Sequence, residues 1–190
     1  FRRVLFRSDP NAQMDPSVIR NITHYLSAPE WDPIIGKIKN TKLMDPTSPV
    51  QVMFVPSYLN GVDGIFDKDY YELLCGMDVT VFPSYYEPWG YTPLESVAFS
   101  VPTITTSLAG FGLWVAEHCK EHKGVEVIDR NDANDSEVVT EIASSIEKFC
   151  NMSAKEYASY QESALKTSEI ALWENLYAYY AHAYDVALAR

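Results

Sequence analysis

The sequence has few cysteines and no long apolar run. Its 190 residues include three cysteines, which are widely spaced and form no Cys-x-x-Cys pair. This arrangement predicts neither a disulfide framework nor a zinc site, and it favours a reducing compartment, which we take as cytoplasmic. No apolar run reaches the roughly 18 residues that a transmembrane helix needs, and we expect no leader peptide from the pattern of the first residues. We therefore expect no contact with a membrane.

Positive charge is also scarce, since 26 Asp and Glu outnumber 15 Lys and Arg and give a net charge of −11. Binding to a phosphate backbone depends on Lys and Arg, so we expect no nucleic-acid partner. The same balance disfavours electrostatic attachment to anionic lipid. Hydrophobic residues make up 47% of the chain, which is enough to bury a sizeable core.

Three parts are expected along the chain. Residues 1–49 form an irregular and partly helical segment interrupted by four Asp-Pro pairs, and residues 1–8 carry no usable pattern, which suggests a foreign origin. Residues 50–170 form the main domain. Residues 171–190 form an aromatic helix, interpreted either as a packed helix face or as a carbohydrate-stacking surface.

The main domain alternates short β-branched stretches with helical ones. The pattern predicts strands at 50–55, 79–82, 103–106 and 125–128, and helices at 32–39, 69–77, 92–100, 136–150, 154–166 and 171–189. Such alternation is typical of βαβ units, so we expect an α/β fold with a parallel sheet flanked by helices. Ligands of these sheets bind beyond the carboxyl ends of the strands.

The loop after the 79–82 strand is the richest in chemistry. From residue 84 to residue 95 it runs Ser-Tyr-Tyr-Glu-Pro-Trp-Gly-Tyr-Thr-Pro-Leu-Glu. Thr92 as the N-cap, Pro93 as the first helical residue and Glu95 as the third would begin a helix with a capping box.

This helix start also predicts an anion site. Free N–H groups at Gly90, Tyr91 and Thr92 would suit a phosphate. Glu87 and Glu95 flank that position, and carboxylates accept hydrogen bonds from vicinal sugar hydroxyls. Spacing alone leaves open whether Glu95 caps its own helix or binds a ligand.

The stretch from Val81 to Glu95 closely resembles the signature of glycogen synthases of the animal and fungal type. The match continues in register through 101–112, and it extends upstream to 54–60 and 69–72 and downstream to the closing helix at 173–180. The likeness is dense over roughly residues 50–115.

This resemblance implies a retaining glucosyltransferase with a GT-B fold, two Rossmann-like domains with the active site between them. Such an enzyme transfers glucose from a nucleotide-glucose, here expected to be UDP-glucose, to the non-reducing end of an α-1,4-glucan, glycogen, without a metal or other cofactor. The chain resembles the back part of the C-terminal domain, so the N-terminal acceptor domain is expected to be missing. The full-length parent is expected to be a homo-oligomer.

The resemblance also implies roles for single residues. Glu87 would be the catalytic carboxylate that holds the donor sugar beside the reacting carbon. The donor-binding residues implied are Tyr70 for the base, Glu95 for the ribose, Gly90, Tyr91 and Thr92 for the distal phosphate, and Trp89. The family's Arg and Lys pair near the start of this domain has no match here, so the chain alone is expected to be inactive.

Other interpretations stay open. Another nucleotide-sugar transferase with the Glu-x7-Glu pattern, similar to starch or sucrose synthases, would prefer adenine nucleotides. A non-catalytic module that binds nucleotide or glucan is a further alternative. His118 and His122 stand one helical turn apart without the His-Glu-x-x-His pattern, so we expect a solvated helix face rather than a metal site.

Overall fold

The computed structural model describes residues 22–41, 43, 47 and 49–189. The chain divides into two compact units, Phe1–Leu73 and Leu74–Arg190, and each is described by itself. The expected foreign segment at residues 1–8 lies outside the described residues. None of the described helices has the length and apolar character needed to span a membrane.

The first unit contains short helices. The 3₁₀ helix η1 (Pro29–Trp31) precedes α1 (Pro33–Lys39), whose N-cap Asp32 accepts hydrogen bonds from the N–H groups of Ile34 and Ile35. This capping carboxylate, followed by a proline at the first helical position, confirms the helix expected at 32–39. Helix α2 (Tyr70–Leu74) is shorter than the 69–77 expected, because Gly76 disfavours a further turn.

The strand expected at 50–55 is wrong. Within that stretch, among the described residues, only Phe54 pairs as a strand would, in an isolated parallel bridge to Ile22. The Thr23 N–H donates to the Phe54 carbonyl at 3.0 Å. β-branched residues favour a strand only where a neighbouring backbone runs alongside them, and the described residues show such a bridge at Phe54.

The second unit holds a parallel sheet in the order β1 (Thr80–Val81), β2 (Thr103–Thr106) and β3 (Val125–Ile128). All four residues of β2 are buried, as expected for the central strand of a covered parallel sheet. Thr103 pairs with Thr80 on one side and Val125 on the other. The α/β prediction is confirmed, and β2 and β3 have the bounds expected.

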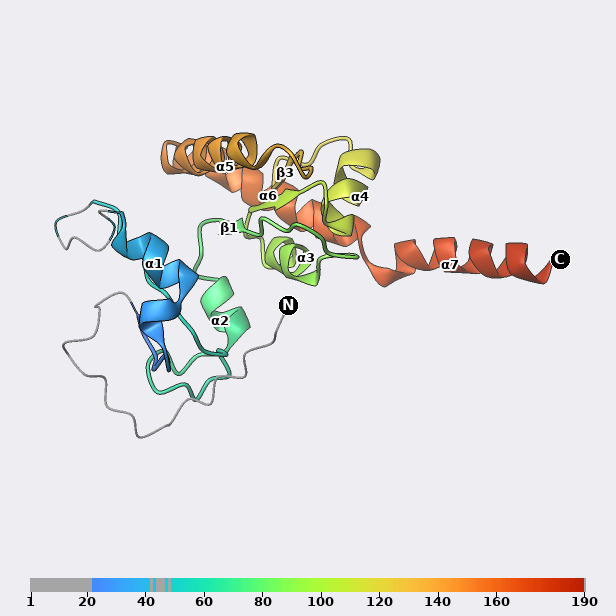
Figure 1. Cartoon of the computed structure of the whole chain (residues 1–190). Coiled ribbons are helices and arrows are strands. Elements are labelled where there is room, and N and C mark those ends of the chain that lie inside the picture. Colours follow the sequence, from blue (N-terminus) through green and yellow to red (C-terminus); the bar gives the residue numbers. More distant parts are fainter. Residues whose placement is uncertain (1–21, 42, 44–46, 48, 190) are drawn as a thin grey trace. The chain divides into compact units, whose positions relative to one another are not determined.

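Helices cover both faces of this sheet (Figure 1). On one face, Ile104 and Ile128 pack against Val138 of α5 (Asp135–Cys150). On the other, Val125 belongs to a core that is completed by α3 (Tyr91–Ala98), α4 (Gly110–His118) and α6 (Ala154–Ile170). The result is a three-layer arrangement with two apolar cores.

Helix α4 is not among the helices expected from the sequence, and it contains two glycines, Gly110 and Gly112. At both glycines the backbone of a neighbouring segment comes close to the helix. A Cβ at Gly110 would collide with the Pro88 carbonyl oxygen, and one at Gly112 with the Thr106 carbonyl oxygen. Glycine is required here because backbone from a neighbouring segment occupies the space of a side chain.

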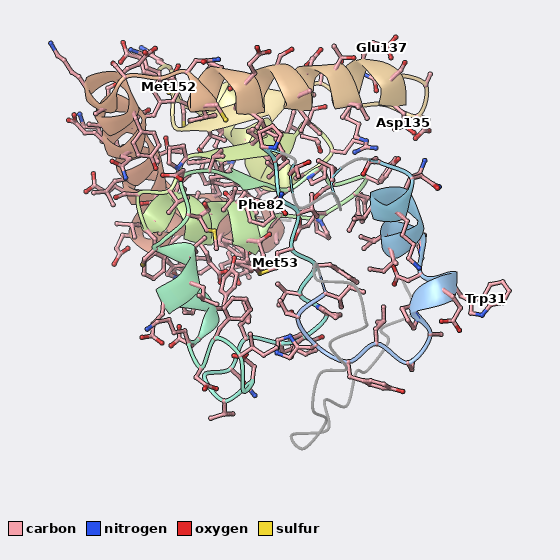
Figure 2. The ribbon with its side chains drawn as sticks, turned by 90° about the vertical axis from the view of Figure 1, so that its left-hand side faces the viewer. Trp31, Met53, Phe82, Asp135, Glu137 and Met152 are labelled. Carbon is pink, nitrogen blue, oxygen red and sulfur yellow. The ribbon has the colours of Figure 1, made fainter. Side chains whose placement is uncertain are left out.

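The last helices close the second unit. Figure 2 shows Asp135 and Glu137 at one end of α5 and Met152 beyond the other. Ser153 caps α6 by accepting a hydrogen bond from the Glu156 N–H at 3.2 Å. Helix α7 (Trp173–Leu188) extends away from the sheet and buries none of its described residues (Figure 1). Its aromatic rings stay about half exposed, although the Tyr179 ring lies edge-on to that of His118, with centroids 6.4 Å apart.

Candidate functional site

Glu87 lies on the loop that leaves the carboxyl end of β1. Its backbone forms an isolated parallel bridge with Ala109. The Glu87 N–H donates to the Leu108 carbonyl at 3.1 Å, and its own carbonyl accepts from the Gly110 N–H at 3.0 Å. The side chain is half-buried, and its Oε2 accepts a hydrogen bond from the Ser84 hydroxyl at 3.2 Å. The carboxylate of Glu87 is thus fixed both through its backbone and through a side-chain neighbour.

Gly90 begins the next helix. It is buried and takes the positive φ of 105° with ψ of 75°, as the N-cap of α3. The expected start at Thr92 is therefore wrong, since α3 begins at Tyr91. A glycine with positive φ lets the chain turn directly into the helix, which a threonine could not do without strain.

The first turn of α3 presents free backbone donors. No side chain caps the helix, and the first N–H groups of any helix have no partner within it. Gly90, Tyr91 and Thr92 supply N–H groups there, and Pro93 has none to supply. The anion site expected from the sequence therefore has its donors in the predicted residues, although the helix starts earlier.

Glu95 is the fifth residue of α3, not the third. A capping box requires a Glu or Gln side chain at the third helical position, and Pro93 occupies that position. The capping interpretation of Glu95 is therefore wrong. The ribose-binding role of Glu95 stays a prediction. The side chain is half-buried, one helical turn from the N-terminus.

Trp89 is part of the apolar core. Its ring centroid lies 5.9 Å from that of Phe111 and 5.8 Å from that of Trp114, and its carbonyl accepts a hydrogen bond from the Phe111 N–H. This packing accounts for a tryptophan at position 89. A contact between Trp89 and a donor stays a prediction.

Tyr70 lies in the first unit, where it is the first residue of α2. Its N–H donates to the Leu59 carbonyl at 3.1 Å, and its ring centroid lies 5.3 Å from that of Tyr71. The structure thus gathers the other predicted site residues in the second unit and places Tyr70 in the other. Its stacking on a base stays a prediction.

Sequence reasoning missed Arg130, which follows β3 by two residues. Its side chain is only 5% exposed, although a guanidinium is costly to bury. It donates to the Pro83 carbonyl and to the Asp135 carboxylate, both at 2.8 Å. The available signal was an arginine just past the carboxyl end of an apolar strand in an acidic chain.

The histidine pair does not share a helix face. His118 is the last residue of α4, and its Nδ1 lies 3.0 Å from the Trp114 carbonyl oxygen. His122 lies beyond that helix, with Nδ1 2.9 Å from the Val125 carbonyl oxygen. Across the described part of the chain, no cluster of three or more His, Cys, Asp or Glu could hold a metal ion.

Comparison with known proteins adds a family match. The family model described as Glycogen synthase matches residues 2–190. The chain is 36% identical over 162 residues to a glycogen [starch] synthase of Caenorhabditis elegans, covering 84% of this chain and 24% of that protein. It is 32% identical over 195 residues to glycogen [starch] synthase isoform 1 of Saccharomyces cerevisiae, covering 100% of this chain and 27% of that protein.

A human relative gives a similar result. The glycogen [starch] synthase of liver from Homo sapiens is 32% identical over 171 residues, which are 88% of this chain and 24% of that protein. The chain therefore spans about a quarter of the length of the curated relatives it matches.

Proposed function

Because the chain belongs to the glycogen synthase family, we propose that it forms the donor-binding part of a retaining glucosyltransferase. The proposed donor is UDP-glucose, and the proposed acceptor is the non-reducing end of an α-1,4-glucan. We propose that the reaction uses no metal and that it runs in the cytoplasm, in a homo-oligomer whose other domain binds the acceptor.

One observation carries this proposal. The Glu87 carboxylate stands directly beside the N-terminus of α3: a Cβ built at Gly90 would lie 3.6 Å from Glu87 Oε2. A carboxylate and a row of free N–H donors thus meet at the carboxyl edge of a parallel sheet. These edges are where ligands of open α/β sheets bind.

The helix start suits a phosphate group. Its N–H groups and the dipole of α3 favour an anion, by roughly 0.3–1 kcal/mol at an exposed site and up to about 2 kcal/mol where partly buried. These donors are fixed before the reaction, so they stabilise a departing diphosphate without having to reorganise.

Glu87 suits the sugar attached to that phosphate. A carboxylate accepts hydrogen bonds from hydroxyl groups, and its negative charge stabilises positive charge that develops on the reacting carbon. If a phosphate binds at the start of α3, the sugar attached to that phosphate lies within a few ångströms of it. The carboxylate of Glu87 is at that distance from the helix start. Glu95 would take the ribose hydroxyls and Tyr70 the base.

The charge of the leaving diphosphate needs further cations. Among the described residues Arg130 is the single arginine, and its side chain is already bound to Asp135 and Pro83. We therefore propose that the arginine that meets the diphosphate comes from outside these residues, and we expect no turnover by this chain alone.

Calorimetric titration of the 190-residue chain with UDP and ADP tests the proposal. We expect weak binding that prefers UDP and that Glu95→Ala reduces. The control is Glu147→Gln, which removes an exposed carboxylate from α5 and should leave the affinity unchanged.

Each other outcome has a defined meaning. Tighter binding of ADP would favour a transferase of the starch-synthase kind. A folded chain that binds neither nucleotide would refute the donor site on these residues.

A further inference from the structure

Three side chains form a closed cluster at the carboxyl edge of the sheet: Arg130, Tyr85 and Asp135. The guanidinium carbon of Arg130 lies 3.4 Å from the centroid of the Tyr85 ring, and its Nη2 donates to Asp135 Oδ1 at 2.8 Å. The Tyr85 hydroxyl lies 3.2 Å from each Asp135 carboxylate oxygen. We call this set the Arg130 cluster.

The same arginine joins the loops that follow all three strands. Its Nη1 donates to the carbonyl of Pro83, after β1, at 2.8 Å. Its backbone N–H donates to the hydroxyl of Ser107, after β2, at 2.9 Å. Arg130 itself follows β3, so one residue connects the whole edge on which the candidate site lies.

Stability alone does not explain an arginine here. A buried charge is costly unless every polar group is satisfied, and Arg130 Nε is buried without a hydrogen-bond partner among the described residues. Asp135 is 63% exposed, so water weakens its attraction for the guanidinium. What arginine provides is a flat face that stacks on Tyr85 together with two donors that point in different directions.

The two groups that Arg130 holds flank Ser84. Pro83 and Tyr85 are its chain neighbours, and the Ser84 hydroxyl donates to Glu87 Oε2 at 3.2 Å. The backbone of Glu87 is fixed separately, by its bridge to Ala109. Arg130 is therefore placed to act on the direction of the Glu87 carboxylate and not on the position of its backbone.

We propose that Arg130 is a positioning residue that, by holding Pro83 and Tyr85, fixes Ser84 and so orients the carboxylate of Glu87. The effect of Arg130 on donor binding rests on the proposed function of Glu87. The effect of Arg130 on the orientation of the carboxylate does not. Loss of Arg130 should weaken the contact of Glu87 with the sugar and spare the nucleotide bound at α3.

The first experiment needs no ligand. In NMR spectra of the 190-residue chain, we expect a cross-peak between the β protons of Ser84 and the γ protons of Glu87. Arg130→Met should abolish this cross-peak. Lys148→Met should leave it intact, because it removes a cation of α5 that is paired with Glu126 of β3. If it persists in Arg130→Met, the proposal is wrong whether or not the chain binds a donor.

The second experiment measures the affinity for UDP-glucose relative to UDP. We expect Arg130→Met to lower this ratio about tenfold, as the loss of a well-directed hydrogen bond to a charged group would, with UDP affinity unchanged. Ser84→Ala should do the same, and the double variant should be no worse than either, because both changes act on one contact. Additive losses, or an unchanged ratio with a lower melting temperature, would overturn the positioning role.

The two proposals fail in different ways. If the wild-type chain binds neither nucleotide, the proposed function fails, and the cross-peak still decides the role of Arg130. If Arg130→Met does not fold, Arg130→Lys replaces it. Lysine keeps the charge but cannot stack as a plane or reach two acceptors, so we expect an intermediate ratio and a weakened cross-peak. Wild-type values in Arg130→Lys would overturn the proposal.

Discussion

Substitution of Gly90 by alanine tests the geometry of the helix start most directly. Gly90 has a φ of 105°, a region that side chains with a Cβ rarely adopt. The left-handed conformation costs an alanine about 1–2 kcal/mol. The new Cβ would also lie 3.2 Å from Pro93 Cγ, which is closer than an ordinary contact, and Pro93 is buried and rigid.

A compensating effect makes the net loss smaller. Alanine restricts the unfolded chain more than glycine does, which favours folding by about 0.4–1 kcal/mol. We therefore expect Gly90→Ala to lower the free energy of unfolding of the second unit by about 1 kcal/mol. Urea denaturation followed by fluorescence should show a lower midpoint with an unchanged slope.

The matched comparison is Gly36→Ala. Gly36 lies inside α1, and a Cβ there would meet nothing within 4 Å. Alanine favours a helix interior over glycine by roughly 0.5–1 kcal/mol, so this variant should stabilise its own unit. If Gly90→Ala proved as stable as the wild type, the positive φ and the helix start at Tyr91 would both be refuted.

Three further outcomes are expected. Gly110→Ala should lower the free energy of unfolding by about 1–3 kcal/mol, measured by urea denaturation, because its Cβ would collide with the Pro88 carbonyl oxygen. The Phe66 N–H, which donates to the Asp63 carboxylate, holds the pKa of Asp63 below its usual value. The stabilisation of that turn should be complete above about pH 4 and lost as the pH falls further, which an NMR titration of the Phe66 amide would follow. Burial raises the pKa of the Cys119 thiol, so iodoacetamide should label the two exposed cysteines first, and mass spectrometry should find Cys119 modified only after unfolding.

The sheet was predictable where short β-branched strands are covered by helices on both faces. The runs that form β2 and β3 are short and β-branched, and helices pack on both faces of these strands. β2 is buried throughout, and β3 is buried at its first and last residues. The run at 50–55 is likewise rich in β-branched residues, yet in the described residues it forms an isolated bridge at Phe54 and no strand. The composition of a segment shows that it can form a strand. Whether a partner strand lies beside it depends on the whole fold.

The site was predictable in its residues but not in its geometry. Gly90, Tyr91 and Thr92 supply the helix start as expected, but Gly90 with its positive φ is the N-cap in place of Thr92, so the helix begins two residues earlier. Helix α4 was not predicted, because the carbonyl groups that require its two glycines come from elsewhere in the chain. Arg130 is 45 residues from Tyr85 in sequence and contacts it in the fold, so no local pattern could join them.

The four tryptophans give the chain a built-in optical reporter. Trp31 and Trp173 are 83% and 59% exposed, so unfolding hardly changes their surroundings. Trp89 and Trp114 lie against the apolar core beside the helix start, with ring centroids 5.8 Å apart. A red shift of the emission on unfolding therefore reports on the core of the second unit. Disturbance around Gly90 can be followed by intrinsic fluorescence, without an attached dye or a catalytic assay.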